Sequence, residues 1–280
     1  MKKTDMVMVH QRLTENIKKY IYIIKQEYGE YMSKEILVRL NSINDYNQIL
    51  KIFDYGEISA YANSENIMMP LCADRLLNLV SMVPGYGINK NHIPYNEKNI
   101  VINNNTFLSY LKHVYISGTN AEGYYDDLLL HETMHFCGSD GGSVLKEGLT
   151  EYLTRTIASK YNLRTNSCGY PKEVKLAHKL IEVFGFDMVK KLSFMNNFNQ
   201  EMVFIAENLG SEYARLYSEI YIGAEKEFNE KYYSHMKEFS GLTGIVKKVL
   251  FYKKIDYSNI YKLIEDFNIS LQDKNTKKYK

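Results

Sequence analysis

The five residues from position 131 read His-Glu-Thr-Met-His, so that two histidines stand four positions apart. On an α-helix such residues lie about 40° apart on one face, and the imidazoles of His131 and His135 could bind the same metal ion. Glu132, about 100° round the helix, would lie beside that ion and could take a proton from a water molecule on it. The motif predicts a zinc site that performs hydrolysis.

A catalytic zinc ion takes three protein ligands and leaves one position open for water, so the histidines need a third partner. The run Ser-Asp-Gly-Gly-Ser at 139–143 is typical of a turn, and Ser143 is a suitable N-cap for a second helix at about 144–160. Glu147 and Glu151 would share one face of that helix, and Glu147 is the predicted third ligand. The opposite face is expected to point to the core through Leu145, Leu149 and Leu153.

Gly148 follows the predicted ligand directly. Glycine inside a helix costs about 1 kcal/mol relative to alanine, so its presence needs a reason. Close approach of the two helices at the metal would supply one.

Other interpretations of these residues stay open. Asp140, soon after the first helix, is a rival third ligand. The longer motif His-Glu-x-x-His-x-x-Gly-x-x-His would need its last ligand at the position of Gly141. Glu147 and Glu151 could form a solvated helix face, which Arg155 would suit. The two histidines could also be core residues satisfied by hydrogen bonds.

The His-Glu-x-x-His motif at 131–135 and the Glu-Gly-x-x-Glu segment at 147–151 together resemble the gluzincin metallopeptidases. In that clan a glutamate on the next helix completes the zinc site. The resemblance implies that Glu147 binds Zn²⁺ with the two histidines and that Glu132 is the general base. It also implies that Glu151 orients a ligand histidine, which fixes the tautomer and the angle of the ring.

The resemblance covers about residues 98–160, with three departures. The link at 136–146 is short for a gluzincin and is closer to the compact members of the clan. The Gly-x-Met-Glu-Asn strand of the aminopeptidase branch is absent, so an endopeptidase is expected. No residue clearly matches the oxyanion-stabilising tyrosine or histidine; the candidates are Tyr170, before the following helix, and His178 on that helix.

The composition excludes several classes of protein. The 280 residues are 45% hydrophobic and 24% charged, as in an ordinary globular protein. A net charge near +2, without a basic stripe interleaved with aromatic residues, gives no basis for nucleic-acid binding. No apolar run approaches the roughly 18 residues of a membrane span. The apolar stretch 6–9 is too short for a signal peptide, so the cytoplasm is the default location, with export by another route left open.

Three cysteines, Cys72, Cys137 and Cys168, make an odd number without Cys-x-x-Cys spacing. This argues against a disulfide framework or a structural zinc cluster. Cys137 stands two positions after His135, and we expect it to be a small buried hydrophobic residue. The alternative is a redox or ligand role near the metal.

The elements that must position these residues are mostly helices. Apolar residues at spacings of three and four predict an amphipathic first helix within 7–28 and a long helix within 213–239. Pro171, suited to a first helical turn, and Gly185, suited to a helix end, bracket a further helix.

The only convincing strands are 100–102 and 114–116, just before the metal helix, where gluzincins carry a small sheet whose edge binds peptide substrates. The predicted fold is therefore α+β, mainly α, with a zincin-like metallopeptidase core and a small antiparallel or mixed sheet. That core is expected at 96–165. It would be flanked by an N-terminal helical region, 1–95, and a C-terminal helical lobe, 166–280.

The predicted function is a zinc-dependent peptidase that acts on a peptide or protein substrate. The metal would polarise the scissile carbonyl while Glu132 activates water and later passes its proton to the leaving amine. The alternative is a non-catalytic helical binding or regulatory protein that keeps the metal for structure. Glu132 counts against that alternative, because a structural zinc site needs no general base.

Overall fold

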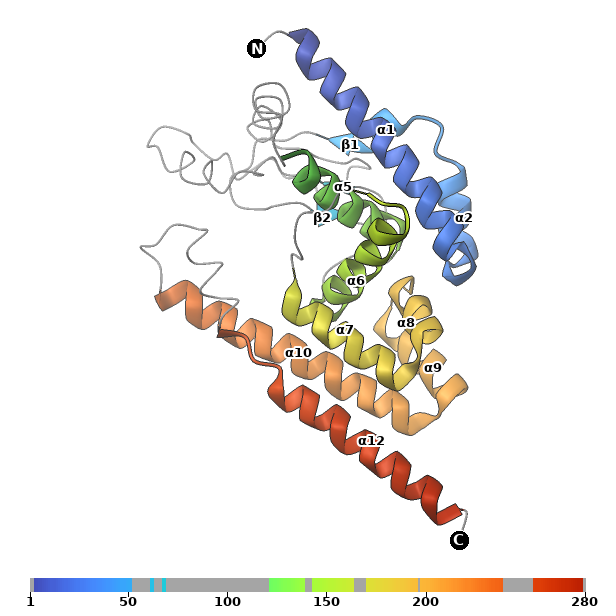
Figure 1. Ribbon diagram of the computed structural model, residues 1–280, viewed down its shortest axis with the longest axis vertical. Coiled ribbons are helices and arrows are strands. Elements are labelled where there is room, and N and C mark those ends of the chain that lie inside the picture. The colour runs from blue at the N-terminus through green and yellow to red at the C-terminus, as the bar shows by residue number, and fades with distance from the viewer. Residues whose placement is uncertain are drawn as a thin grey trace. The chain divides into compact units, whose positions relative to one another are not determined.

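The computed structural model describes residues 3–51, 61–62, 67–68, 121–138, 143–163, 170–195, 197–238 and 254–278. Most of these residues are helical (Figure 1). Two single-turn 3-10 helices lie at Gly29–Tyr31 and Tyr46–Gln48. The α-helices are α1 (Lys3–Tyr28), α2 (Lys34–Asn41), α5 (Ala121–Cys137), α6 (Val144–Lys160), α7 (Pro171–Phe184), α8 (Phe186–Ser193), α9 (Phe198–Leu209), α10 (Ser211–Glu238) and α12 (Ser258–Lys278).

The predicted α+β fold, with a sheet in a zincin-like core, is wrong for the part of the chain that the structure describes. There, extended pairing is limited to β1 (Leu50–Lys51), β2 (Tyr61–Ala62) and β3 (Ile67–Met68). The order is β1-β3-β2, with β1 parallel and β2 antiparallel to β3. The predicted strands at 100–102 and 114–116 lie outside the described residues.

The described elements fall into two compact units. The first unit contains α1, α2, β1 to β3, α5 and the end of α6 from Leu153 onward. The second unit contains α6 up to Tyr152, then α7 to α10 and α12. The division into three regions expected from the sequence stays a prediction.

In the first unit, α1 packs against α5, and β2 and β3 pack against α5 as well. Tyr28, at the end of α1, donates a hydrogen bond from its hydroxyl to the carbonyl of Leu153 at 3.3 Å. The predicted amphipathic character of α1 is confirmed, because one helical stripe of it is buried. That stripe includes Leu13, Ile17, Ile21, Ile24 and Tyr28.

In the second unit, α9 and α12 both pack against α10, and α7 packs against α8 and α12 (Figure 1). Helix α7 begins at Pro171 and ends at Phe184, as the sequence predicted, and Gly185 follows as its C-cap with a φ of 82° in the left-handed region that glycine tolerates. None of the described helices is both long and apolar enough to cross a bilayer. Every helix of this unit contributes to its core, through residues such as Leu149, Leu180, Leu192, Ile205, Tyr217 and Ile264.

Gly148 permits a close contact between α6 and α7. A Cβ atom added at Gly148 would lie 2.4 Å from the carbonyl oxygen of Glu173 and 2.9 Å from the Cβ of that residue. The sequence was right to expect a close approach here. The neighbour that this glycine accommodates is α7, however, rather than the first metal helix.

Gly148→Ala is expected to lower the free energy of unfolding by about 1–3 kcal/mol, because the new methyl group meets backbone that cannot move without shifting α7. This loss would outweigh the gain of about 1 kcal/mol in helix propensity. Gly223→Ala in α10 is the matched control, since its Cβ would meet Ile260 at an ordinary 3.5 Å. Urea unfolding should show the control stabilised and Gly148→Ala destabilised. Equal gains in both variants would contradict the contact.

Candidate metal centre

Helix α5 holds the first motif in a buried setting. His131, Glu132 and His135 expose only 5%, 4% and 3% of their surface. Arg39, from α2, donates from Nη2 to the carbonyl oxygen of Phe136 at 2.6 Å, near the end of α5. A positive charge at a helix C-terminus is stabilising. Apolar residues next to the histidines in the sequence are buried as well, namely Leu129, Leu130, Met134 and Phe136.

The two histidines converge as the four-residue spacing predicts. Their Nε2 atoms lie 3.1 Å apart, and their rings meet edge to face with centroids 4.8 Å apart. A tetrahedral zinc ion with bonds of about 2.0–2.1 Å to nitrogen would hold two such atoms about 3.3–3.4 Å apart. The observed separation is close to that requirement.

Glu147 lies in the first part of α6, whose bounds match the predicted helix. The backbone N–H of Lys146 donates to Ser143 Oγ at 3.1 Å, which confirms Ser143 as the N-cap. The N–H of Val144 donates to Glu225 Oε1 at 2.5 Å. The start of the helix, and with it Glu147, is therefore held by side-chain contacts.

The structure brings the three predicted ligands together. One ligand atom each from His131, His135 and Glu147 lie within 4.8 Å of one another. Two imidazole nitrogens and one carboxylate oxygen are the donor set of many catalytic zinc sites, and three protein ligands leave a position open. This group of side chains can hold a metal ion. Asp140 and Gly141, the other positions considered, lie outside the described residues.

The predicted core face of α6 is confirmed, whereas the solvated interpretation of its other face is not. Leu145, Leu149 and Leu153 are each 1% exposed and form the core face. On the other face Glu147 is half-buried and Glu151 is 3% exposed. The interpretation of Glu147 and Glu151 as a solvated pair is therefore wrong for Glu151.

Two further candidates are placed at α7. Tyr170 is half-buried at the N-cap position, where its side chain makes no capping hydrogen bond. Its role in stabilising an oxyanion stays a prediction. His178 is exposed, and its ring lies edge-on to that of Tyr152 with centroids 4.7 Å apart; its role stays a prediction as well.

Cys137 is fully buried at the end of α5, as a small hydrophobic residue would be. Burial raises the pKa of its thiol to about 12, although the positive charges of Arg39 and Lys25 oppose the shift. The thiolate is the reactive form, and at pH 8 such a thiol is ionised to only about one part in ten thousand.

Iodoacetamide at pH 8 is therefore expected to leave Cys137 unmodified in the folded protein and to modify it readily in urea. Mass mapping of the peptide that contains Cys137 would measure both reactions. Labelling of the folded protein as fast as that of an unfolded peptide would contradict the burial.

Two buried polar groups of the second unit were not predicted from the sequence. Glu173, 1% exposed, accepts a hydrogen bond on Oε1 from the hydroxyl of Tyr257 at 3.0 Å, and its Oε2 has no hydrogen-bond partner among the described residues. Burial raises the pKa of Glu173, and the nearby charge of Glu147 adds to the effect. The second group is centred on Lys146. The one signal in the sequence was the position of this lysine in a first helical turn, where a positive charge is unfavourable.

The chain was also compared with known proteins. No family model, curated protein or solved structure matches it.

Proposed function

We propose that this protein is a zinc-dependent peptidase of the gluzincin type that cleaves peptide bonds within a peptide or protein substrate. The observation that carries the proposal is the grouping of ligand atoms from His131, His135 and Glu147 within 4.8 Å. A buried carboxylate, Glu132, directly follows one of these ligands in the same helix. A metal-binding group beside a potential base is the arrangement that metal-assisted hydrolysis requires.

The donor set favours zinc over the hard divalent cations. Imidazole nitrogens suit zinc and other transition metals, whereas magnesium and calcium take oxygen ligands. Both histidines are buried, which keeps bulk water from competing for their nitrogens. In the proposed site His131, His135 and Glu147 hold the ion.

When bound, zinc supplies Lewis acidity, which polarises the scissile carbonyl and lowers the pKa of a water molecule to about 7. Glu132 accepts the proton of the attacking water on its carboxylate and then delivers it to the leaving amine. Glu151, buried four residues beyond Glu147, orients a ligand histidine. Tyr170 is the proposed donor to the developing oxyanion.

Metal analysis followed by a cleavage screen tests the proposal. Protein purified without added metal and dialysed extensively should contain one zinc ion per chain. A mixed-sequence peptide library, read by mass spectrometry, should reveal internal cleavages that a chelator stops and added zinc restores. Protein that binds no zinc from micromolar solution, or cleavage that survives full removal of metal, would refute the proposed function.

A further inference from the structure

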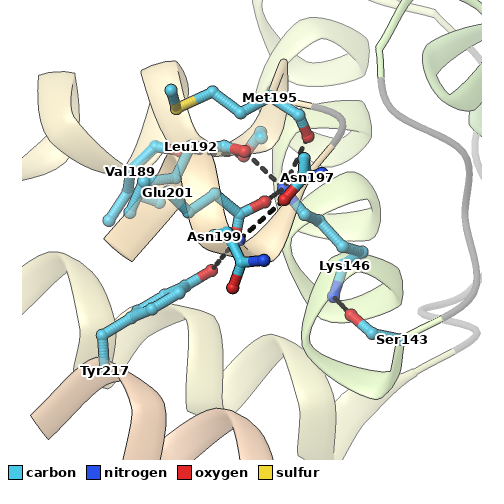
Figure 2. A network of polar contacts seen from close by, with 10 residues as sticks. Ser143, Lys146, Val189, Leu192, Met195, Asn197, Asn199, Glu201 and Tyr217 are labelled. Carbon is cyan, nitrogen blue, oxygen red and sulfur yellow. Dashed lines mark hydrogen bonds and ion pairs between the residues drawn. The ribbon is translucent and has the colours of Figure 1, made fainter. Parts of the chain in front are cut away.

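The side chain of Lys146 lies in the core of the second unit. It is 7% exposed, although lysine is seldom buried so deeply. Its ammonium group contacts Glu201 Oε1 at 2.6 Å and the carbonyl oxygen of Met195 at 3.2 Å, and it also donates to the carbonyl of Leu192 (Figure 2). All three N–H groups of the ammonium ion thus have acceptors, which fixes the direction of the side chain.

The acceptors are themselves held in place. Glu201 is 1% exposed, and its second oxygen accepts from the hydroxyl of the fully buried Tyr217 at 2.7 Å (Figure 2). The side chain of Asn197 accepts from the N–H of Asn199 at 2.8 Å and so caps α9 just before Glu201. The network of Lys146, Glu201 and Tyr217 therefore ties the first turn of α6 to the α8–α9 connection, α9 and α10.

Stability alone does not account for this network. A buried ion pair rarely stabilises a fold more than an apolar pair of similar volume, because both charges lose their hydration. A lysine in the first turn also opposes the helix dipole. What a saturated ion pair does supply is one defined orientation.

The network holds α6 at the residue next to Glu147, whose orientation matters for the proposed zinc site. Lys146, Glu147 and Gly148 are consecutive, so their side-chain directions differ by about 100° at each step. Lys146 fixes the helix through the polar network, and Gly148 fixes it through the backbone of Glu173. Side-chain ends lie about 6 Å from the helix axis, so a rotation of about 20° would move the Glu147 carboxylate by about 2 Å. Metal bonds tolerate only about 0.2 Å.

We infer that Glu201 and Tyr217, acting through Lys146, set the rotation of α6 and so position Glu147 to bind the metal. They are positioning residues, and the inference rests on the proposed zinc site. We expect Glu201 and Tyr217 to increase the affinity for the metal, in addition to any effect that they have on the stability of the fold.

The triple variant Lys146→Met/Glu201→Leu/Tyr217→Phe separates these two contributions. It removes one positive and one negative charge, so the net charge is unchanged, and it leaves neither a buried ion nor the buried hydroxyl of Tyr217 without a partner. We expect the urea midpoint to stay at or above that of the wild type. The zinc dissociation constant, measured by competition with a chromophoric chelator, should rise about 10–100-fold, as it does when residues that orient a ligand are lost. The absorption bands of the Co²⁺-loaded variant should change as well, since they report ligand geometry.

Ile220→Val, a buried change in α10 outside the network, is the control. It should lower stability by about 0.5–1.5 kcal/mol without changing zinc affinity. If the triple variant does not fold, the single variants Glu201→Gln and Tyr217→Phe should each weaken zinc binding, the first more than the second. A wild type that binds zinc, with folded network variants that bind it equally tightly and give the same cobalt spectrum, would overturn the positioning role alone. A wild type that binds no zinc would overturn the proposed function and this inference together.

Discussion

Glu132→Gln should bind zinc as tightly as the wild type and lose about 10²–10⁴-fold in the rate of peptide hydrolysis. The amide keeps the volume of the carboxylate but cannot accept a proton from water. Because Glu132 is 4% exposed and lies in α5 directly after His131, its replacement by a group of the same shape should leave the histidines in place. The test compares initial rates on a cleaved peptide with zinc content measured on the same preparation.

Glu132→Asp is the matched control, since it keeps the charge and the basicity but draws the carboxylate back by one methylene group. Its rate should fall between those of the wild type and Glu132→Gln. Hydrolysis at the wild-type rate in zinc-loaded Glu132→Gln would mean that another group accepts the proton. Loss of zinc from that variant would instead assign Glu132 to metal binding.

Glu147→Ala should abolish stoichiometric zinc binding under conditions where the wild type keeps one ion per chain. Two imidazoles alone leave two positions of a tetrahedral ion without protein ligands. Residues that only orient a ligand contribute about 10–100-fold in affinity, so the loss of a ligand should exceed about 100-fold. Competition with a chelator measures the dissociation constant, and circular dichroism shows whether the helices persist.

Two variants make the assignment of Glu147 specific. Glu151→Ala should weaken zinc binding by the smaller factor expected of an orienting group. Asp140→Ala should leave zinc binding intact. A folded Glu147→Ala protein that still holds one zinc ion per chain, together with an Asp140→Ala protein that has lost it, would transfer the third ligand to Asp140.

The helices could be predicted because their signals are local. Ser143 as N-cap and the leucines of α6 gave the bounds of that helix, and Pro171 and Gly185 gave those of α7. The sheet prediction is wrong for the described residues, since strands depend on pairing with partners distant in the chain and short apolar runs carry little information about them. The described strands are two residues long and begin at positions 50, 61 and 67, where no strand was predicted.

The sequence by itself determined the convergence of His131 and His135. Once α5 forms, a spacing of four places both rings on one face, where their Nε2 atoms lie 3.1 Å apart. It also determined the leucine face of α6.

Only the tertiary structure decided which other groups meet these elements. Glu147 lies near the histidines because of the path that the chain takes between α5 and α6. The periodicity of the sequence does not encode that path. The burial of Lys146 against Glu201 and the fit of Gly148 against Glu173 depend on packing between helices that are far apart in sequence. The physical reason is that helical period and capping act over a few residues, whereas packing and the pairing of buried charges depend on which surfaces the whole fold brings into contact.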